Sequence, residues 1–112
     1  MSTVSVSRVN ISVIVPFLNE EATVVDLHVR LCQVLSRLGV SFEIIFVDDG
    51  SRDATFERMK SLSPLVSIRM RRNCGQTAAL AAGIHEAKGD IIVTLDGDLE
   101  NDPDDIPMLI GK

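Results

Sequence analysis

The chain has 112 residues, of which 46% are hydrophobic and 24% charged, a composition typical of one soluble globular domain or part of one. No apolar stretch approaches the roughly 20 residues of a membrane span, and the N-terminus lacks the long apolar core of a secretory signal, so we expect a cytosolic protein. The net charge is −5 and Trp and Tyr are absent, so nucleic acid is a poor candidate partner, since its binding needs basic stripes and stacking aromatics.

Four short apolar segments predict β-strands. They are rich in β-branched residues and nearly continuous in hydrophobicity, as in parallel strands that are buried on both faces. The segments between them carry helical periodicity or helix-capping residues. In chain order we expect a strand at 11–17, a helix from about 20 to 38, a strand at 42–48, a helix at 53–62, a strand at 65–70, a helix at 76–88 and a strand at 90–96.

The alternation of strands and helices predicts a Rossmann-like α/β fold. Because crossover connections are right-handed, the strands form a parallel sheet with helices on both faces. A flexible segment is expected over residues 1–10 and the domain over residues 11–112. Four strands are few for such a sheet, so we expect a truncated domain whose missing part covers an exposed edge.

Local patterns predict the helix ends and the places of the histidines. Asn19 is a plausible N-cap for the first helix, and Gly89 is a plausible left-handed C-cap for the third. His28 lies on the apolar stripe of the first helix and is expected to pack in the core, whereas His85 is expected to be exposed. The two cysteines have no metal-binding spacing and are expected to be structural thiols.

The acidic residues are concentrated at one end of the chain, where six of the sixteen lie within residues 96–112. Asp96, Asp98 and Glu100 alternate after the last strand, so in an extended chain their carboxylates face one point. Two carboxylates about 5 Å apart repel by roughly 3 kcal/mol at an effective dielectric of about 20, and a divalent cation would offset this cost. Mg²⁺ and Mn²⁺ prefer such oxygen ligands, and Gly97 leaves room for a ligand near the backbone. The alternative is a set of solvated turn residues before a helix.

Two other kinds of cation site fit the sequence less well. A calcium EF-hand loop beginning at Asp96 needs Gly and Glu at its sixth and twelfth positions, which are Asn101 and Pro107. A receiver-like Mg²⁺-binding signalling module would carry its acid pair after the first strand, whereas Asp48 and Asp49 follow the second. The glycine-rich phosphate loops of P-loop and dinucleotide-binding proteins are absent from the sequence. Phosphate handling is therefore expected to depend on a metal held by acids.

The acid pair after the second predicted strand has two compatible interpretations. Ligands of open parallel sheets bind outside the carboxyl ends of the strands. There, Asp48 or Asp49 can accept a hydrogen bond from a ribose hydroxyl or a base N–H. The other interpretation is a βα turn with Ser51 or Asp53 as a helix cap.

Further charged residues follow the first and third predicted strands. Glu20 could face a ligand or complement the dipole of the first helix, and the residues alone favour the dipole. Arg69, Arg71 and Arg72 could meet a diphosphate or balance the nearby acids.

Four stretches between Ile11 and Pro107 resemble glycosyltransferase family 2, whose members are inverting enzymes with a nucleotide-sugar-binding domain of the GT-A fold. They are ISVIVPFLNEE, FEIIFVDDGSRDAT, RRNCGQTAALAAGI and GDIIVTLDGDLENDPDDIP. Within the family the chain is most similar to the branch of dolichol-phosphate mannosyltransferase and bacterial polyprenyl-phosphate glycosyltransferases, because of RNCG and DGDLENDP.

The resemblance implies a UDP- or GDP-sugar donor, a Mg²⁺ or Mn²⁺ cofactor and a polyprenyl phosphate acceptor. The residues implied in nucleotide-sugar binding are Pro16, Leu18, Glu20, Val47, Asp48, Asp49, Arg72, Asp96 and Gly97, and the implied metal ligands are Asp96, Asp98 and Glu100. Glu100 departs from the family pattern, which usually has Gln there. No catalytic residue is identified within the chain, because an anionic lipid phosphate could attack the sugar directly, without the general base that a hydroxyl needs.

By this resemblance, residues 11–112 are the N-terminal nucleotide-sugar-binding part of a glycosyltransferase, and the acceptor-binding half lies beyond Lys112. The chain alone could therefore bind the donor without turnover, and a non-catalytic nucleotide-sugar-binding fragment stays an alternative. Membrane association is expected only through parts beyond this chain, which would place the full-length protein at the cytoplasmic face of a membrane, in cell-envelope glycan synthesis.

Overall fold

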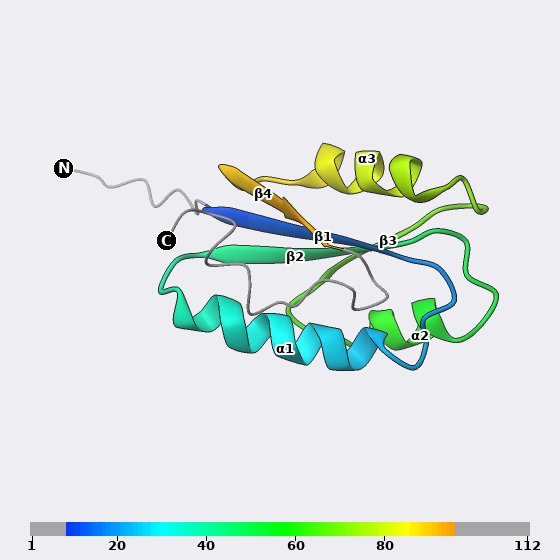
Figure 1. The fold of residues 1–112 in the computed structure, drawn as a ribbon, viewed down its shortest axis with the longest axis horizontal. Helices are drawn as coiled ribbons and strands as arrows, with labels where there is room; N and C mark the ends of the chain where they lie inside the picture. The colour runs from blue at the N-terminus through cyan, green and yellow to red at the C-terminus, as the bar shows by residue number, and fades with distance from the viewer. Residues whose placement is uncertain (1–8, 96–112) are drawn as a thin grey trace, which may run out of the picture.

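The computed structural model describes residues 9–95, in which four strands alternate with three helices (Figure 1). The elements are β1 (Ile11–Phe17), α1 (Val24–Arg37), β2 (Phe42–Asp48), α2 (Thr55–Lys60), β3 (Val66–Arg69), α3 (Gln76–Glu86) and β4 (Ile91–Thr94). This order confirms the predicted alternation. No helix of the described residues is long and apolar enough to cross a membrane.

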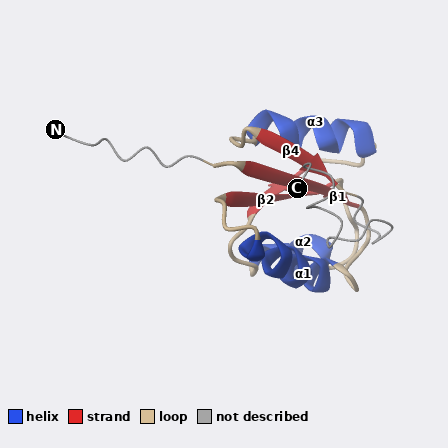
Figure 2. Ribbon diagram, turned by 60° about the vertical axis from the view of Figure 1, so that its left-hand side comes forward, coloured by secondary structure: helices blue, strands red, loops and turns tan. Residues whose placement is uncertain are grey.

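The four strands form one parallel sheet with the order β3-β2-β1-β4. The chain moves outward from β1 to β2 and β3, and then returns to place β4 on the other side of β1. Helices α1 and α2 cover one face, and α3 covers the other (Figures 1 and 2). The predicted doubly covered parallel sheet is confirmed. Its strand order reverses between β1 and β4, which is where such sheets bind ligands.

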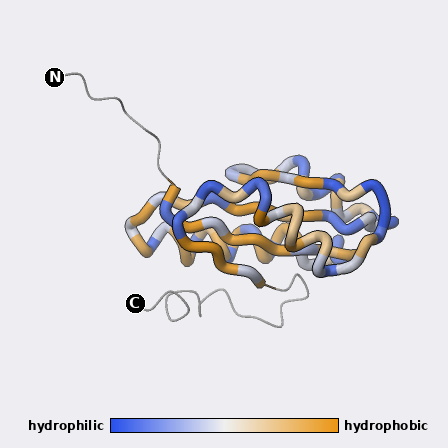
Figure 3. The backbone as a smooth tube through the Cα atoms, turned by 90° about the horizontal axis from the view of Figure 1, so that it is seen from above, coloured by the Kyte–Doolittle hydropathy of each residue, from blue (hydrophilic) through white to orange (hydrophobic). Residues whose placement is uncertain are grey.

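The core has two unequal halves, one on each face of the sheet. The larger half joins strand residues such as Val15 and Phe46 to the apolar stripe of α1, including Leu31. Each such side chain contributes about 1.5–3 kcal/mol when fully buried. On the other face, α3 approaches the sheet closely, because a Cβ at Gly83 would lie 2.4 Å from Ile14 Cγ2. Figure 3 shows hydrophobic residues along the strands and polar residues in the connecting loops.

The outer strands differ from the sequence-based prediction. β1 is buried along its whole length, and β2 is buried from Ile44 onward, as expected of central strands. β3 and β4 are mostly exposed, with Ile91 and Ile92 42% and 43% accessible. The prediction that they are buried on both faces is wrong for the described part of the sheet. There, β3 and β4 are the outer strands, and each pairs with a strand on one side only.

Two predicted helix ends are also wrong. Helix α1 begins at Val24, and Asn19 instead adopts a left-handed conformation (φ 55°) in the preceding loop. Asparagine tolerates this conformation better than most residues do. Helix α3 ends at Glu86, and Gly89 lies against β1, where a Cβ would come within 2.6 Å of Ser12 Oγ. A close approach between chain segments, and not a left-handed cap, requires that glycine.

The predicted packing role of His28 is confirmed. The ring is 5% exposed, meets Phe46 edge-on at 6.0 Å between centroids, and places Nε2 2.8 Å from Pro64 O. His85 is exposed, as predicted. Both cysteines are free, and burial raises the pKa of the Cys32 thiol.

Candidate functional site

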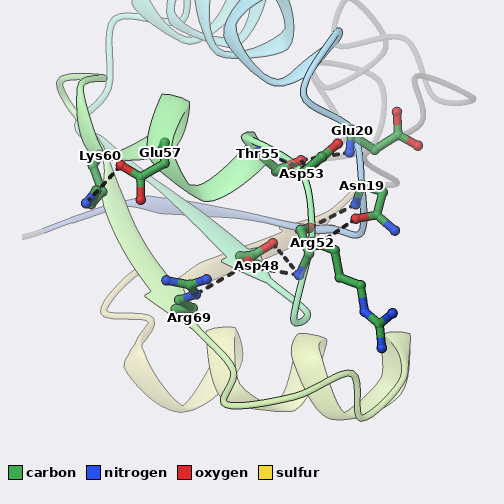
Figure 4. A network of polar contacts seen from close by, with 10 residues as sticks. Asn19, Glu20, Asp48, Arg52, Asp53, Thr55, Glu57, Lys60 and Arg69 are labelled. Atoms are coloured by element: carbon green, nitrogen blue, oxygen red, sulfur yellow. Dashed lines mark hydrogen bonds and ion pairs between the residues drawn. The ribbon is translucent and has the colours of Figure 1, made fainter.

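The loops that follow β1 and β2 are hydrogen-bonded to each other at the carboxyl edge of the sheet (Figure 4). Ser51 Oγ accepts from the Asn19 amide at 2.8 Å, and Asn19 Oδ1 accepts from the Arg52 amide at 2.8 Å. The hydroxyl of Thr55 accepts from the Glu20 amide, also at 2.8 Å. These bonds join segments more than 30 residues apart into one polar surface beside the end of β1.

A second set of contacts fixes the outer part of this surface. Asp53 accepts from the Glu21 amide at 3.3 Å and from the amide and hydroxyl of Thr55, and Glu21 in turn accepts from the Ala54 amide at 2.8 Å. Partial burial acts to raise the pKa of Asp53, but the hydrogen bonds outweigh it and lower the pKa below its ordinary value. The carboxylate therefore stays ionised at neutral pH and holds the start of α2 against the β1–α1 loop.

Asp48 ends β2 with its carboxylate fully buried. Both carboxylate oxygens lie near one donor, the Ser51 amide, at 3.2 and 3.3 Å. Arg69 Nε lies 3.8 Å from Oδ2, and its guanidinium lies over the Phe56 ring at 4.8 Å. A carboxylate has about four acceptor positions, but this side chain has no solvent-accessible surface through which a ligand could reach them. Its contact with ribose or base stays a prediction.

Asp49 differs from Asp48 in its partners. Its Oδ1 accepts from the Cys74 amide at 2.8 Å and its Oδ2 from the Gly75 amide at 3.0 Å. Its own amide donates to Phe17 O at 2.8 Å, which ties the end of β2 to the end of β1. Asp49 thus brings the segment before α3, which includes the exposed Arg72, to the same edge.

The other predicted site residues in the described range divide by burial. Pro16 and Val47 pair in register within the sheet, and both residues are buried. Their side chains are therefore not open to a ligand in this structure. Leu18 is 40% exposed, and Glu20 is half-buried, with Oε1 accepting from the Thr23 hydroxyl at 3.1 Å. Their roles toward a nucleotide stay predictions.

The predicted metal ligands lie outside the described residues, as does Gly97. The structure carries the chain as far as Leu95, whose amide donates to Ile14 O at 3.0 Å beside β1. Asp96 is the next residue in sequence, and Asp98 and Glu100 follow. Within residues 9–95, no group of three or more His, Cys, Asp or Glu side chains is arranged to hold a metal ion.

Sequence comparison assigns the chain to a family. The profile of Glycosyl transferase family 2 matches residues 12–112. The chain belongs to glycosyl transferase family 2. This confirms the resemblance inferred from the sequence.

Two curated relatives carry the same name, undecaprenyl-phosphate 4-deoxy-4-formamido-L-arabinose transferase. The protein from Pseudomonas aeruginosa (strain LESB58) is 42% identical over 107 residues, which is 91% of this chain and 32% of the relative. The protein from Salmonella paratyphi B is 40% identical over the same number of residues, which is 33% of its own length. These names confirm the predicted similarity to polyprenyl-phosphate transferases. The chain spans about a third of the length of these relatives.

Solved structures confirm the GT-A fold of the family. Glucosyl-3-phosphoglycerate synthase from Mycobacterium tuberculosis, in complex with Mn²⁺, UDP and glucosyl-3-phosphoglycerate, aligns with a TM-score of 0.70 at 29% identity, covering 94% of this chain and 39% of that one. A mannosyltransferase from Pyrobaculum calidifontis, in complex with GDP-mannose and Mn²⁺, aligns with a TM-score of 0.64 at 25% identity, covering 81% and 28%.

Sequence reasoning missed the residues that join the loops. Ser51 was expected at most as a helix cap, Thr55 was given no role, and Asn19 was expected to be the N-cap of the first helix, which in fact begins at Val24. Their partners lie 32 to 35 residues away, so no local pattern reports them. The available signal was indirect: an amide side chain, Asn19, follows β1, and the hydroxyl side chains of Ser51 and Thr55 follow β2.

Proposed function

We propose that the full-length protein is a metal-dependent inverting glycosyltransferase that moves a sugar from a nucleotide-sugar to a polyprenyl phosphate. Family membership and the undecaprenyl-phosphate transferases among its relatives support this activity. The observation that carries the proposal for this chain is the set of hydrogen bonds between loops at the carboxyl edge of the sheet. Loops after β1, β2 and β3 are hydrogen-bonded together there, and the acidic segment follows directly after β4 in the sequence. Neither the family nor the relatives favour a receiver-like module.

The donor would bind across this edge. Asp48 or Asp49 would accept a hydrogen bond from a ribose hydroxyl or a base N–H, and Leu18 and Glu20 lie on the β1–α1 loop at the same edge. Arg72 is exposed on the segment before α3 and supplies positive charge for the diphosphate. Asp96 and Gly97, which follow β4, would lie along the nucleotide sugar. Both UDP and GDP should be tested as the nucleotide of the donor, because one of the two solved relatives contains UDP and the other contains GDP-mannose.

A divalent cation fits the donor set of the acidic segment. Asp96, Asp98 and Glu100 offer carboxylate oxygens, the ligands that Mg²⁺ and Mn²⁺ prefer. Mn²⁺ accompanies the nucleotide in the two solved relatives described above. When bound, the cation supplies Lewis-acid stabilisation of the departing nucleoside diphosphate. The described residues contribute the hydrogen bonds that hold the surrounding loops in place.

The acceptor would be the anionic phosphate of a polyprenyl lipid, which can attack the anomeric carbon without a protein base. We place the enzyme at the cytoplasmic face of a membrane, with the lipid engaged by parts of the protein beyond this chain. A non-catalytic nucleotide-sugar-binding protein is the alternative. An assay of sugar transfer to undecaprenyl phosphate by the full-length protein separates the two.

Thermal unfolding tests the donor site directly. UDP or GDP with Mn²⁺ is expected to raise the melting temperature of the full-length protein, because ligand at 100 times its Kd adds about 2.7 kcal/mol to the free energy of unfolding. Asp98→Ala should remove the shift, because it removes an oxygen ligand. Glu86→Ala, an exposed acid at the end of α3, is the matched control and should keep it. A wild-type protein that folds but shows no shift with either nucleotide would contradict the proposal.

A further inference from the structure

The face of the sheet that carries α3 is only partly covered within residues 9–95. Helix α3 packs on the two central strands, where Ala79 joins Ile14 and Val47 in the smaller half of the core. Among the described residues, no member of β4 belongs to that half. Helix α3 therefore leaves the β4 side of this face open.

Two large aliphatic side chains border the open area. Val93 belongs to the larger half of the core, so Ile92, the preceding residue of β4, faces the α3 side, and it is 43% exposed. On α3, Ile84 follows Gly83, which lies against β1, and it is 46% exposed. One position along a helix is a turn of about 100°. Because α3 runs antiparallel to the strands in a right-handed crossover, this turn directs Ile84 toward β4.

The chain after β4 contains an apolar segment that matches this surface. Residues 106–110 read IPMLI and carry no charge, whereas residues 96–105 contain six acids. Both stretches lie outside the described residues. Ten residues reach at most about 35 Å, which is enough to return along the four residues of β4, about 13 Å long. Residues 106–110 can therefore reach Ile84 and Ile92.

Crossover handedness favours the α3 face for this segment. Helices α1 and α2 lie on the other face, where the chain moves outward from β1 to β3, and α3 lies on its own face, where the chain moves back to β4 (Figures 1 and 2). Consecutive strands are usually neighbours, and crossovers between parallel strands are right-handed in about 98% of cases. A connection that continues outward from β4 therefore crosses on the same face as α3.

We propose that residues 106–110 pack against Ile84 and Ile92 and so anchor the far end of the acidic segment, residues 96–102. The near end is already fixed, because the Leu95 amide donates to β1 at 3.0 Å. An acidic segment that is anchored at both ends has fewer conformations that compete with the cation-binding one. Ile84 and Ile92 are then positioning residues for the cation. The packing rests on the fold alone, and its effect on the cation rests on the proposed function.

Hydrogen–deuterium exchange in the full-length protein tests the packing. Ile92→Ser should speed exchange in the peptide that covers residues 106–110, because it removes an apolar contact of that segment. Ile91→Ser is the matched control and should leave that peptide unchanged, since Ile91 is 42% exposed on the same strand and faces the α1 side with Val93. Ile84→Ser repeats the test from α3, so the test does not depend on the folding of one variant.

Two results of the exchange experiment would overturn the packing. Unchanged exchange of residues 106–110 in both Ile92→Ser and Ile84→Ser would show that the segment lies elsewhere. Faster exchange in Ile91→Ser alone would place the segment on the α1 face.

Manganese affinity tests the anchoring of the acidic segment. Calorimetry with Mn²⁺ in the presence of UDP or GDP compares the wild type, Ile92→Ser, Leu109→Ser and the double variant. Each single change is expected to raise Kd on the order of tenfold, because the cation then binds a less populated arrangement. The double variant should also lose about tenfold, because either change alone releases the segment. A loss of about a hundredfold would overturn the proposal, since the two residues would then act independently.

The two experiments separate this proposal from the proposed function. If exchange of residues 106–110 responds as expected but the wild type binds no Mn²⁺ with either nucleotide, the proposed function fails and the packing stands. If the wild type binds Mn²⁺ and Ile92→Ser leaves its Kd unchanged, the proposed function stands and the anchoring role fails.

Discussion

The amino and carboxyl edges of the sheet have similar hydrogen bonds, but we assign these bonds different roles. At the amino edge, Glu43 Oε2 accepts from the Ser12 hydroxyl and the Lys88 amide, both at 2.6 Å, while Ser12 Oγ accepts from the Gly89 amide at 2.8 Å. At the carboxyl edge, Asp49 holds the segment before α3 in the same way. In both places a side-chain acceptor on a central strand, or directly after one, fixes the backbone of a neighbouring connection.

The two edges differ in whether the connections carry residues of the proposed donor site. The contacts of the amino edge join β1, β2 and the α3–β4 connection to one another, and we assign them a role in stability. The carboxyl edge orders loops that carry the exposed Arg72 and the half-buried Glu20. The comparison predicts that variants at the amino edge reduce stability alone, whereas variants at the carboxyl edge reduce both stability and nucleotide affinity.

The largest effect is expected for Gly50→Ala at the carboxyl edge. The new Cβ would meet the backbone of Arg72 and Asn73 and would strain a residue at φ +78°, so we expect a loss of about 3 kcal/mol in the free energy of unfolding. Nucleotide affinity should fall as well. Urea unfolding and calorimetry measure the two effects. Gly39→Ala is the control, because Gly39 has φ +70° but nothing within 4 Å, and about 1 kcal/mol is expected.

A smaller effect is expected for Ser12→Ala at the amino edge. The Ser12 hydroxyl is buried, and its removal leaves the Gly89 amide without that acceptor and Glu43 without one donor, at a cost of about 2 kcal/mol by urea unfolding. The Kd for nucleotide with Mn²⁺ should stay unchanged. A weakened affinity in this variant would show that the two edges are coupled and would break the comparison.

The smallest effect concerns Asp53, which lies on the outer part of the carboxyl edge. Asp53→Asn is expected to cost about 1 kcal/mol at pH 7, a modest value because the residue is partly exposed. The folded-state pKa of Asp53 is lowered, so its contribution is complete above the unfolded pKa of about 3.9 and is lost as pH falls through the folded value. The free energies of unfolding of the two proteins, measured at neutral pH and at successively lower pH, should therefore converge as Asp53 becomes protonated. A difference that persists there would assign the effect to shape and not to charge.

The sequence predicted those parts of the fold that depend on local pattern. The bounds of β1 and β2 match the expected strands, because a continuous apolar run indicates a strand buried on both faces. The same pattern misled for β3 and β4, since the composition of a strand does not report how many neighbours it has. Which strand lies at an edge is decided by the strand order.

The candidate site was predictable as a location but not as a set of contacts. The carboxyl ends of the strands follow from the alternation of elements, so Asp48 and Asp49 were placed at the right edge. Their different partners were not foreseeable, because Cys74 and Gly75 approach Asp49 through the packing of α3 across the sheet. Asn19 shows the same limit, since its acceptor role depends on Arg52 in the other loop.

The stack of Asp48, Arg69 and Phe56 offers a way to observe the site by emission spectroscopy. The Arg69 guanidinium contacts both the buried Asp48 carboxylate at the end of β2 and the Phe56 ring on α2. A ligand that changes the contacts of Asp48 would therefore also change the surroundings of residue 56. The chain contains no tryptophan, and an indole introduced by Phe56→Trp would be the sole such fluorophore of these 112 residues. Quenching by the adjacent cation would then change when an incoming base draws Arg69 or Asp48 into new contacts.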